Sequence, residues 1–420
     1  MAEAGSGLES WGSFLRFWGR IGALSFGGPA GQVALLHREL VDQKKLLDDA
    51  QFLRALNFCM LLPGPEAQQL ATWCGWRLKG PAGGLAAGLL FVLPGALVMA
   101  ALALVYIAAG DLQPVRYALW GVQAVVLAIV GEAIIRLSRR SLKTPVAWAF
   151  AAIALLAVEG AHIPFPLLIA VAALGGAWLF PKAKPVAAPM PAPWGKSAAT
   201  AALWLGIWLT PLAFTALWLG PAHAMTRIGA FFAQVAALSF GGAYAALAWV
   251  ADAAVSTQGW LTKADMAVGL GLAETTPGPL VLVFQFVAAL AGAGVEGPWA
   301  SPLLGAGIAM ALVLWMIFAP SFLWIFTFAP HLEGIAARPG LARAMAGISA
   351  AVVGVVASLA LLFARHILFD FPPATGIAAA LFALIGLWLL VKRHWNVALL
   401  VVSGAAAGLV LGYAGVAVPI

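Results

Sequence analysis

Long apolar runs, separated by short polar stretches, dominate this chain of 420 residues. Runs such as 83–110 and 344–363 are longer than the roughly 18 residues that a helix needs to cross a bilayer. The runs are continuous rather than alternating, which favours helices over the strands of a membrane β-barrel. The pattern therefore predicts an all-α polytopic membrane protein.

Two short motifs rich in glycine and proline each occur twice among these apolar runs. Ser25-Phe26-Gly27-Gly28 and Pro63-Gly64-Pro65 return as Ser239-Phe240-Gly241-Gly242 and Pro277-Gly278-Pro279, each 214 positions later (25 to 239, 63 to 277). Interruptions at matched places in two halves are the sequence mark of a transporter built from repeats. We expect a first repeat at 1–180, a linker with an extra membrane segment at 181–222, and a second repeat at 223–420.

Each repeat holds about six membrane segments, two of them broken or re-entrant at the motifs. The apolar stretch 198–220 has no partner in the first repeat and brings the count to about thirteen. Six segments plus one place the second repeat upside down, which predicts inverted-topology repeats. If every segment crosses, 16 of the Lys and Arg residues fall on one side and 7 on the other, favouring a cytoplasmic N-terminus. Whether the motif segments cross fully or re-enter stays open.

The motifs also suggest a binding chemistry. Glycine permits backbone angles closed to other residues, and proline suits the first turn of a helix, so each motif predicts a new helix start. Unpaired N–H groups and the helix dipole make such a start an anion site. The alternative is that these residues only permit kinks and close helix contacts. The candidate anion-binding residues are Ser25, Phe26, Gly27, Gly28, Asn57, Pro63, Gly64, Pro65, Gln68, Gln69, Ser239, Gly241, Gly242, Thr276, Pro277, Gly278 and Pro279.

Four charged residues near the motifs are further candidates. Glu66 directly follows one Pro-Gly-Pro and Glu274 precedes the other, so either could carry a coupling proton. Glu66 could instead only stabilise the start of its helix. Arg20 and Arg77 could draw an anion toward the site, or could anchor helix ends at lipid headgroups. Glu132 and Arg136 are spaced for an i,i+4 ion pair.

Composition and motifs argue against other classes of function. The chain is 63% hydrophobic and 9% charged, unlike a soluble domain, and its net charge of +7 forms no nucleic-acid patch. The six histidines have no neighbouring ligands at metal-binding spacing, so no metal or cofactor is expected. Nucleophile elbows and phosphate-binding glycine loops are missing from the sequence, which points away from an enzyme and from an ATP-driven pump.

Three stretches together resemble the long-chain, two-repeat type of the chromate ion transporter family. They are SFGGPAGQ at 25–32, LLPGPEAQQLA at 61–71 and TTPGPL at 275–280. The resemblance implies an inner-membrane protein in the lipid bilayer that exports chromate and confers chromate resistance, with sulfate as a competing analogue. The second repeat departs from the first, with Ala243-Tyr244 in place of Pro29-Ala30 and Leu280-Val281 in place of Glu66-Ala67. The sequence leaves two alternative functions open: a transporter of sulfate or another oxyanion, and a channel-like uniporter. It also leaves open whether the protein forms a homodimer.

Overall fold

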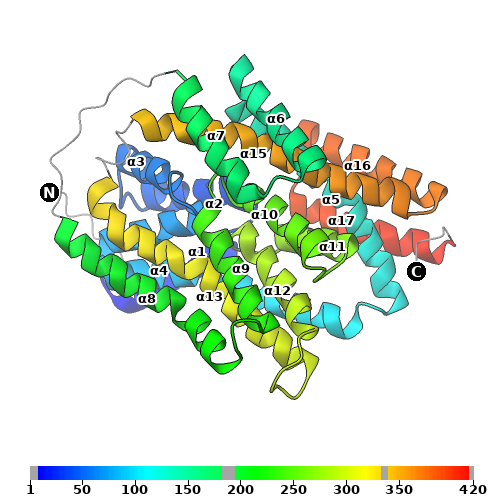
Figure 1. Cartoon of the computed structure of the whole chain (residues 1–420), viewed down its shortest axis with the longest axis horizontal. Coiled ribbons are helices and arrows are strands. Elements are labelled where there is room, and N and C mark those ends of the chain that lie inside the picture. The colour runs from blue at the N-terminus through cyan, green and yellow to red at the C-terminus, as the bar shows by residue number, and fades with distance from the viewer. Residues whose placement is uncertain (1–7, 182–193, 333–338, 416–420) are drawn as a thin grey trace.

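The computed structural model describes residues 8–181, 194–332 and 339–415, and within these ranges the chain is helical without strands (Figure 1). The first repeat comprises α1 (Trp11–Leu24), α2 (Gly28–His37), the π-helix η1 (Arg38–Gln43), α3 (Asp49–Cys59), α4 (Glu66–Ala109), α5 (Gln113–Ser141), α6 (Pro145–Ala161) and α7 (Phe165–Leu179). The helix α8 (Trp194–Trp218) joins it to the second repeat. The second repeat comprises α9 (Ala224–Leu238), α10 (Ala243–Asp252), η2 (Ala253–Thr257), α11 (Lys263–Thr275), η3 (Leu280–Leu282), α12 (Val283–Ala293), α13 (Pro302–Phe328), η4 (Ala329–His331), α15 (Pro339–Arg365), η5 (His366–Asp370), α16 (Pro373–Arg393) and α17 (Val397–Tyr413).

The repeat extends well beyond the two motifs. The helices α3 and α11 begin 214 positions apart, at Asp49 and Lys263, and each follows a π-helix at nearly the same offset. Polar caps open both helices, since Asp48 and Thr262 accept hydrogen bonds from backbone N–H groups three residues on. The all-α, two-repeat architecture that the sequence predicts is confirmed.

The helix α4 is two helices joined at a kink. Lys79 and Gly80 leave the helical region, with φ of −137° and +62°, and Pro81 follows without a backbone donor. The first part, residues 66–78, continues from the Pro-Gly-Pro motif, and the second, 81–109, is the plain span that the sequence predicts at this place. In the second repeat the same two parts are separate helices, α12 and α13.

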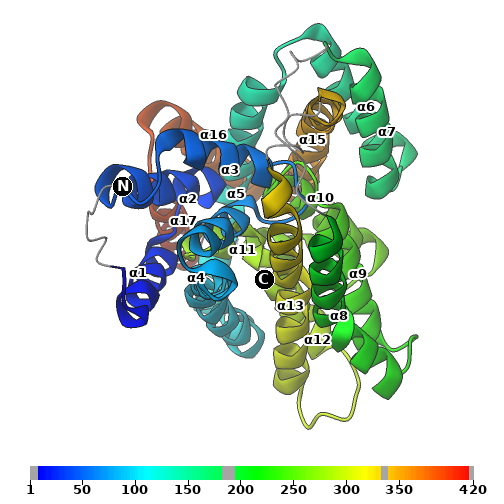
Figure 2. The same ribbon diagram turned by 90° about the vertical axis from the view of Figure 1, so that its left-hand side faces the viewer.

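The two repeats exchange their last helices. The helix α5 of the first repeat packs on α16 and α17 of the second, and α15 of the second repeat packs on α6 and α7 of the first. Figures 1 and 2 show α6, α7 and α15 together, apart from α8, α9, α12 and α13. The two repeats thus follow one another along the sequence, while their helices interlock in space.

Glycines allow the exchanged helices to approach closely. A Cβ atom added to Gly121 of α5 would lie 1.9 Å from the carbonyl oxygen of Gly404 in α17. The second pair has the same feature, since a Cβ on Gly347 of α15 would lie 2.6 Å from the Cα of Gly176 in α7. Small residues at such crossings let van der Waals packing hold membrane helices together.

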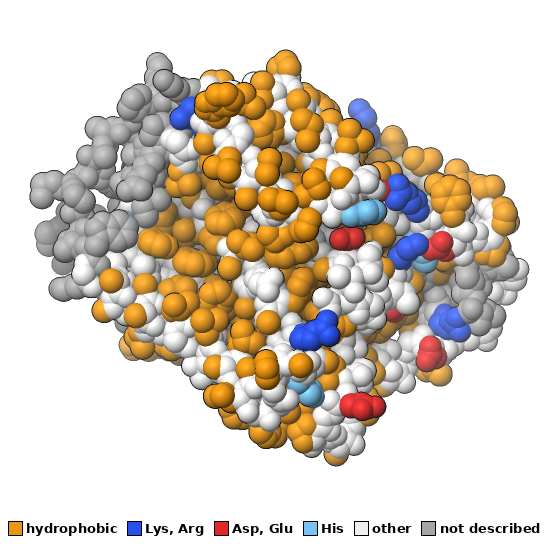
Figure 3. All heavy atoms as spheres, viewed as in Figure 1, with side chains coloured by type: hydrophobic (Ala, Val, Ile, Leu, Met, Phe, Trp, Pro, Cys, Tyr) orange, Lys and Arg blue, Asp and Glu red, His pale blue; other side chains and the backbone are white. Residues whose placement is uncertain are grey.

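Hydrophobic side chains cover much of the face of the molecule that Figure 3 shows. Six helices are long and apolar enough to cross a membrane, by length and composition: Glu66–Ala109, Gln113–Ser141, Ser197–Trp218, Pro302–His331, Gly340–Asp370 and Pro373–Arg393. The segment without a partner, α8, lies against α13, where Trp208 donates its Nε1–H to the Met316 carbonyl at 3.0 Å. The opposite side of α8 is not covered by other helices, and Leu217 is 88% exposed, as expected for a helix that faces lipid. Residues 182–193 of the predicted linker lie outside the described residues.

Candidate functional site

Each of the four motifs ends one helix and begins another. Gly27 holds a left-handed conformation with φ of +88° as the N-cap of α2, and Gly242, with φ of +96°, is the N-cap of α10. Gly64 and Gly278 also have positive φ, of +108° and +95°. After Pro65, α4 begins at Glu66, whereas the second repeat restarts with the short 3-10 helix η3. The helix starts expected from glycine and proline are therefore present.

The motifs of one repeat contact those of the other. The backbone N–H of Gly278 donates to the Ser25 carbonyl at 2.9 Å and to Ser25 Oγ at 3.0 Å. In the equivalent contact the N–H of Gly64 donates to the Ser239 carbonyl at 3.4 Å. Such reciprocal contacts relate the two copies by an approximate two-fold rotation, as inverted repeats require.

The contact between Ser25 and Gly278 is sealed by a side chain that sequence reasoning missed. Gln32 is buried in α2, and its amide nitrogen donates to the Gly278 carbonyl and, at 3.3 Å, to the Ser25 carbonyl. The second repeat has Ala246 at the matching position and lacks this bridge. The difference between Gln32 and Ala246 in the aligned repeats is the sequence feature that could have drawn attention to Gln32.

At the other contact the molecule contains a hollow of about 740 Å³. Its wall includes Gly64 and Glu66 from the first repeat and Gly241, Gly242 and Tyr244 from the second. The start of α2, one face of α3 and residues of α15 complete the wall. Helix starts from both repeats therefore face one cavity, while Pro277, Gly278 and Pro279 do not line it.

Two arginines line the same hollow, although the sequence motifs assign neither of them to the site. Arg136 and Arg140 lie one turn apart near the end of α5. Arg136 makes the expected i,i+4 ion pair with Glu132, at 3.5 Å between Nη1 and Oε2. The spacing of the two arginines on one helix face was visible in the sequence, but the contact of α5 with the motif helices was not.

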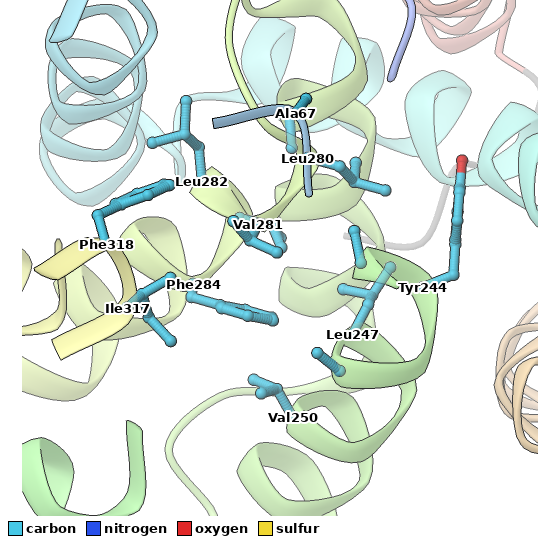
Figure 4. Packing of buried hydrophobic residues seen from close by; sticks show 14 of the residues in the cluster. Ala67, Tyr244, Leu247, Val250, Leu280, Val281, Leu282, Phe284, Ile317 and Phe318 are labelled. Atoms are coloured by element: carbon cyan, nitrogen blue, oxygen red, sulfur yellow. The ribbon is translucent and has the colours of Figure 1, made fainter. Parts of the chain in front are cut away.

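The two candidate coupling carboxylates lie close to the motif region. A Cβ atom on Gly242 would lie 3.6 Å from Glu66 Oε1, so the carboxylate faces the second repeat's break. Glu274 is buried and accepts a hydrogen bond from the Tyr244 hydroxyl at 2.7 Å. Figure 4 shows Tyr244 at the edge of the apolar cluster, with its hydroxyl directed away from Leu247. Arg136 Nη2 lies 3.4 Å from the same hydroxyl and links this pair to α5.

The remaining candidates occupy several places. Phe26, Asn57 and Arg77 are exposed and do not line the hollow, and Arg20, with its side chain 65% exposed, pairs with Glu39 at 3.5 Å. Three buried side chains bond to carbonyls of the protein: Gln68 to Phe318 at 3.4 Å, Gln69 to Pro63 at 2.7 Å and Thr276 to Ala273 at 3.0 Å. Within the described ranges no three metal-ligating side chains come together.

Comparison with known proteins identifies the family of this chain. The sequence model of the chromate transporter family matches residues 12–177 and 226–409, which are the two repeats. The chain is 31% identical to the chromate transport protein of Pseudomonas aeruginosa over 402 residues, covering 94% of this chain and 91% of that protein. It is 29% identical to the chromate transport protein of Cupriavidus metallidurans, covering 92% and 89% of the two chains. No solved structure matches significantly. With both repeats matched, the chain belongs to the chromate transporter family.

Proposed function

We propose that this protein exports chromate across the inner membrane by alternating access, with the anion bound at helix starts of the two repeats. The family and the chromate transport proteins among its relatives support chromate as the transported ion. The observation that carries the proposed site is the hollow in which Gly64 and Gly242, one from each repeat, share a wall.

The chemistry of that wall suits a tetrahedral dianion. Removing an unpaired ion from water into a low dielectric costs tens of kcal/mol, so many donors must replace its hydration shell. The first N–H groups of a helix lack partners within that helix, and those of α10 begin beside Gly242. Together with the two guanidinium groups of α5, they provide positive ends directed at one cavity.

Alternating access is supported by the inequality of the two motif contacts. The contact between Ser25 and Gly278 is buried and bridged by Gln32, whereas the contact between Gly64 and Ser239 borders the hollow. In the opposite conformation the first contact would open while the second closes. A two-fold related pair of half-sites is well suited to such an exchange.

Export is supported by charge and voltage. The hollow lies beside the basic end of α5, and the distribution of Lys and Arg favours a cytoplasmic location for that end. Moving an anion out of a negative-inside cell is favoured by about 2.3 kcal/mol per charge per 100 mV. A dianion therefore gains twice that amount, and strong coupling to protons is not required.

Chromate flux in proteoliposomes under imposed voltage and pH gradients tests the proposal. The Gly242→Ala variant is expected to abolish flux, because at a φ of +96° the added Cβ strains the start of α10 and lies 3.6 Å from Glu66 Oε1 on the wall of the hollow. Gly220→Ala is the matched control, since its φ of +95° is nearly the same but its Cβ would meet nothing within 4 Å. Equal flux in the two variants would contradict the proposed site.

The same vesicles separate the alternatives. Voltage-driven flux that ignores the pH gradient would indicate a uniporter. Sulfate flux faster than chromate flux would indicate a sulfate transporter of the same fold. Absence of both fluxes in the unmodified protein would overturn the proposed function.

A further inference from the structure

Arg136 and Arg140 differ from the other basic residues near the end of α5 because both line the large hollow. At a spacing of four residues their side chains leave the helix on the same face, about 6 Å apart along its axis. Arg139, between them, is exposed and lines a separate, smaller hollow beside α16 that also borders Arg136 and Arg140. Two of the three arginines thus face the motif residues.

Arg140 keeps most of its hydrogen-bonding capacity. Its Nη2 contacts Met60 Sδ at 3.0 Å, and no carboxylate of the described residues lies within ion-pair distance. The Glu66 carboxylate, which also lines the hollow, interacts with it electrostatically. A guanidinium group offers five donors, so Arg140 can bind an anion without first losing a partner.

Arg136 makes two polar contacts, and both of them are long. Its contacts with Glu132 and with the Tyr244 hydroxyl measure 3.5 Å and 3.4 Å. Charge-assisted hydrogen bonds between guanidinium and carboxylate groups normally measure about 2.7–2.9 Å. A strong oxyanion in the hollow could therefore take over Arg136 at small cost.

We propose that Arg136 and Arg140 bind the charge of the transported dianion, and that Glu132 competes with the anion for Arg136. This inference rests on the proposed function. Two guanidinium charges balance the two charges of a tetrahedral dianion, and their planar forks match its oxygen edges. The other ionisable groups of the wall are Glu66, Asp42, His37, Tyr244 and Cys59, of which Asp42 and His37 pair with each other at 3.4 Å. The arginines consequently set a preference for divalent over monovalent anions.

Equilibrium binding of chromate, sulfate and nitrate to the purified full chain in lipid nanodiscs tests the inference. Arg136→Gln and Arg140→Gln should each weaken chromate and sulfate binding by about tenfold or more, since each removes a charge-assisted contact. Nitrate binding should change less, so the preference for dianions falls. Arg139→Gln is the matched control on the same helix end and should bind within about twofold of the unmodified protein, because Arg139 does not line the large hollow. Size-exclusion profiles and melting curves verify the fold of each variant.

Glu132→Gln distinguishes competition from a merely structural ion pair. If Glu132 competes for Arg136, its neutralisation strengthens dianion binding about threefold or more, opposite in sign to Arg136→Gln. Weaker binding in both variants would mark the pair as structural and overturn the inference. If Arg136→Gln fails to fold, Arg136→Lys takes its place, and it should weaken binding because an ammonium lacks the planar fork.

The outcomes also separate this inference from the proposed function. A protein that binds chromate or sulfate equally well with and without both arginines would overturn the inference alone. A protein that binds sulfate through Arg136 and Arg140 but not chromate would support the inference and refute chromate as the substrate. Binding of neither dianion to the unmodified protein would overturn both.

Discussion

The Ser25 hydroxyl accepts a hydrogen bond from the backbone N–H of Gly278 at 3.0 Å, and so joins the first break of one repeat to the second break of the other. The same hydroxyl donates to the Gly22 carbonyl at 2.8 Å, which fixes its orientation. In the equivalent contact Ser239 supplies its carbonyl to Gly64 at 3.4 Å. Identical motifs thus make unequal contacts on the two sides of the approximate two-fold.

Replacing these two serines tests that inequality. Ser25→Ala removes a buried acceptor and should lower the free energy of unfolding by about 1 kcal/mol. Ser239→Ala should cost less, because the contact with Gly64 uses only the backbone of that residue. Thermal midpoints of the two variants in the same detergent provide the comparison. Equal losses would show that the hydroxyl of Ser25 adds nothing to its backbone contact.

Replacing Gln32 is expected to change transport as well as stability. Gln32→Leu keeps the volume but leaves the carbonyls of Ser25 and Gly278 without the amide donor, at a cost of about 1–3 kcal/mol. Trp208→Phe is the control, since Trp208 is also buried and donates to the Met316 carbonyl at 3.0 Å, between α8 and α13. Both variants should melt earlier, but only Gln32→Leu should alter chromate flux in proteoliposomes. Normal flux in Gln32→Leu would contradict a role for this bridge in the transport cycle.

Much of the fold could be predicted because its signals are local. A glycine followed by proline predicts a break and a helix start wherever it lies, and Gly27-Gly28-Pro29 and Gly64-Pro65 do so here. The constant offset between motifs predicts the second repeat. Apolar run length likewise predicts the long spans.

The rest depends on contacts between distant helices. No local pattern indicates that α5 packs on α16 and α17 rather than on α6 and α7. That exchange brings the last turns of α5 to the motif residues and places Arg136 beside Tyr244. A sequence reading therefore assigns Arg136 to a pair with Glu132, which is present, and misses its place in the hollow.

His37 predicts a dependence of stability on pH. Its ring nitrogen lies 2.8 Å from Asp49 Oδ1, and this hydrogen bond, with a smaller contribution from Asp42, raises the pKa of His37 above its usual 6.5. Because the folded-state pKa is raised, the stabilisation is complete below about pH 6.5 and is lost as pH rises through the folded-state value. His37→Gln should therefore melt earlier than the unmodified protein at pH 5.5 and equally at pH 8.5. A difference that does not depend on pH would exclude this ion pair as its source.

Gly121 tests the exchange of helices between the repeats. Its hydrogen faces the Gly404 carbonyl, and the Cβ of Gly121→Ala would approach that oxygen to 1.9 Å, so α5 and α17 must separate. Overpacking of this kind costs about 1–3 kcal/mol. Gly131→Ala on the same helix is the matched control, because its Cβ would make an ordinary 3.4 Å contact with Leu387. Since alanine is the better helix former by up to about 1 kcal/mol, the control should melt no earlier than the unmodified protein. Midpoints measured by thermal unfolding in detergent should therefore move in opposite directions, and equal midpoints would mean that α5 and α17 do not pack as closely as the structure indicates.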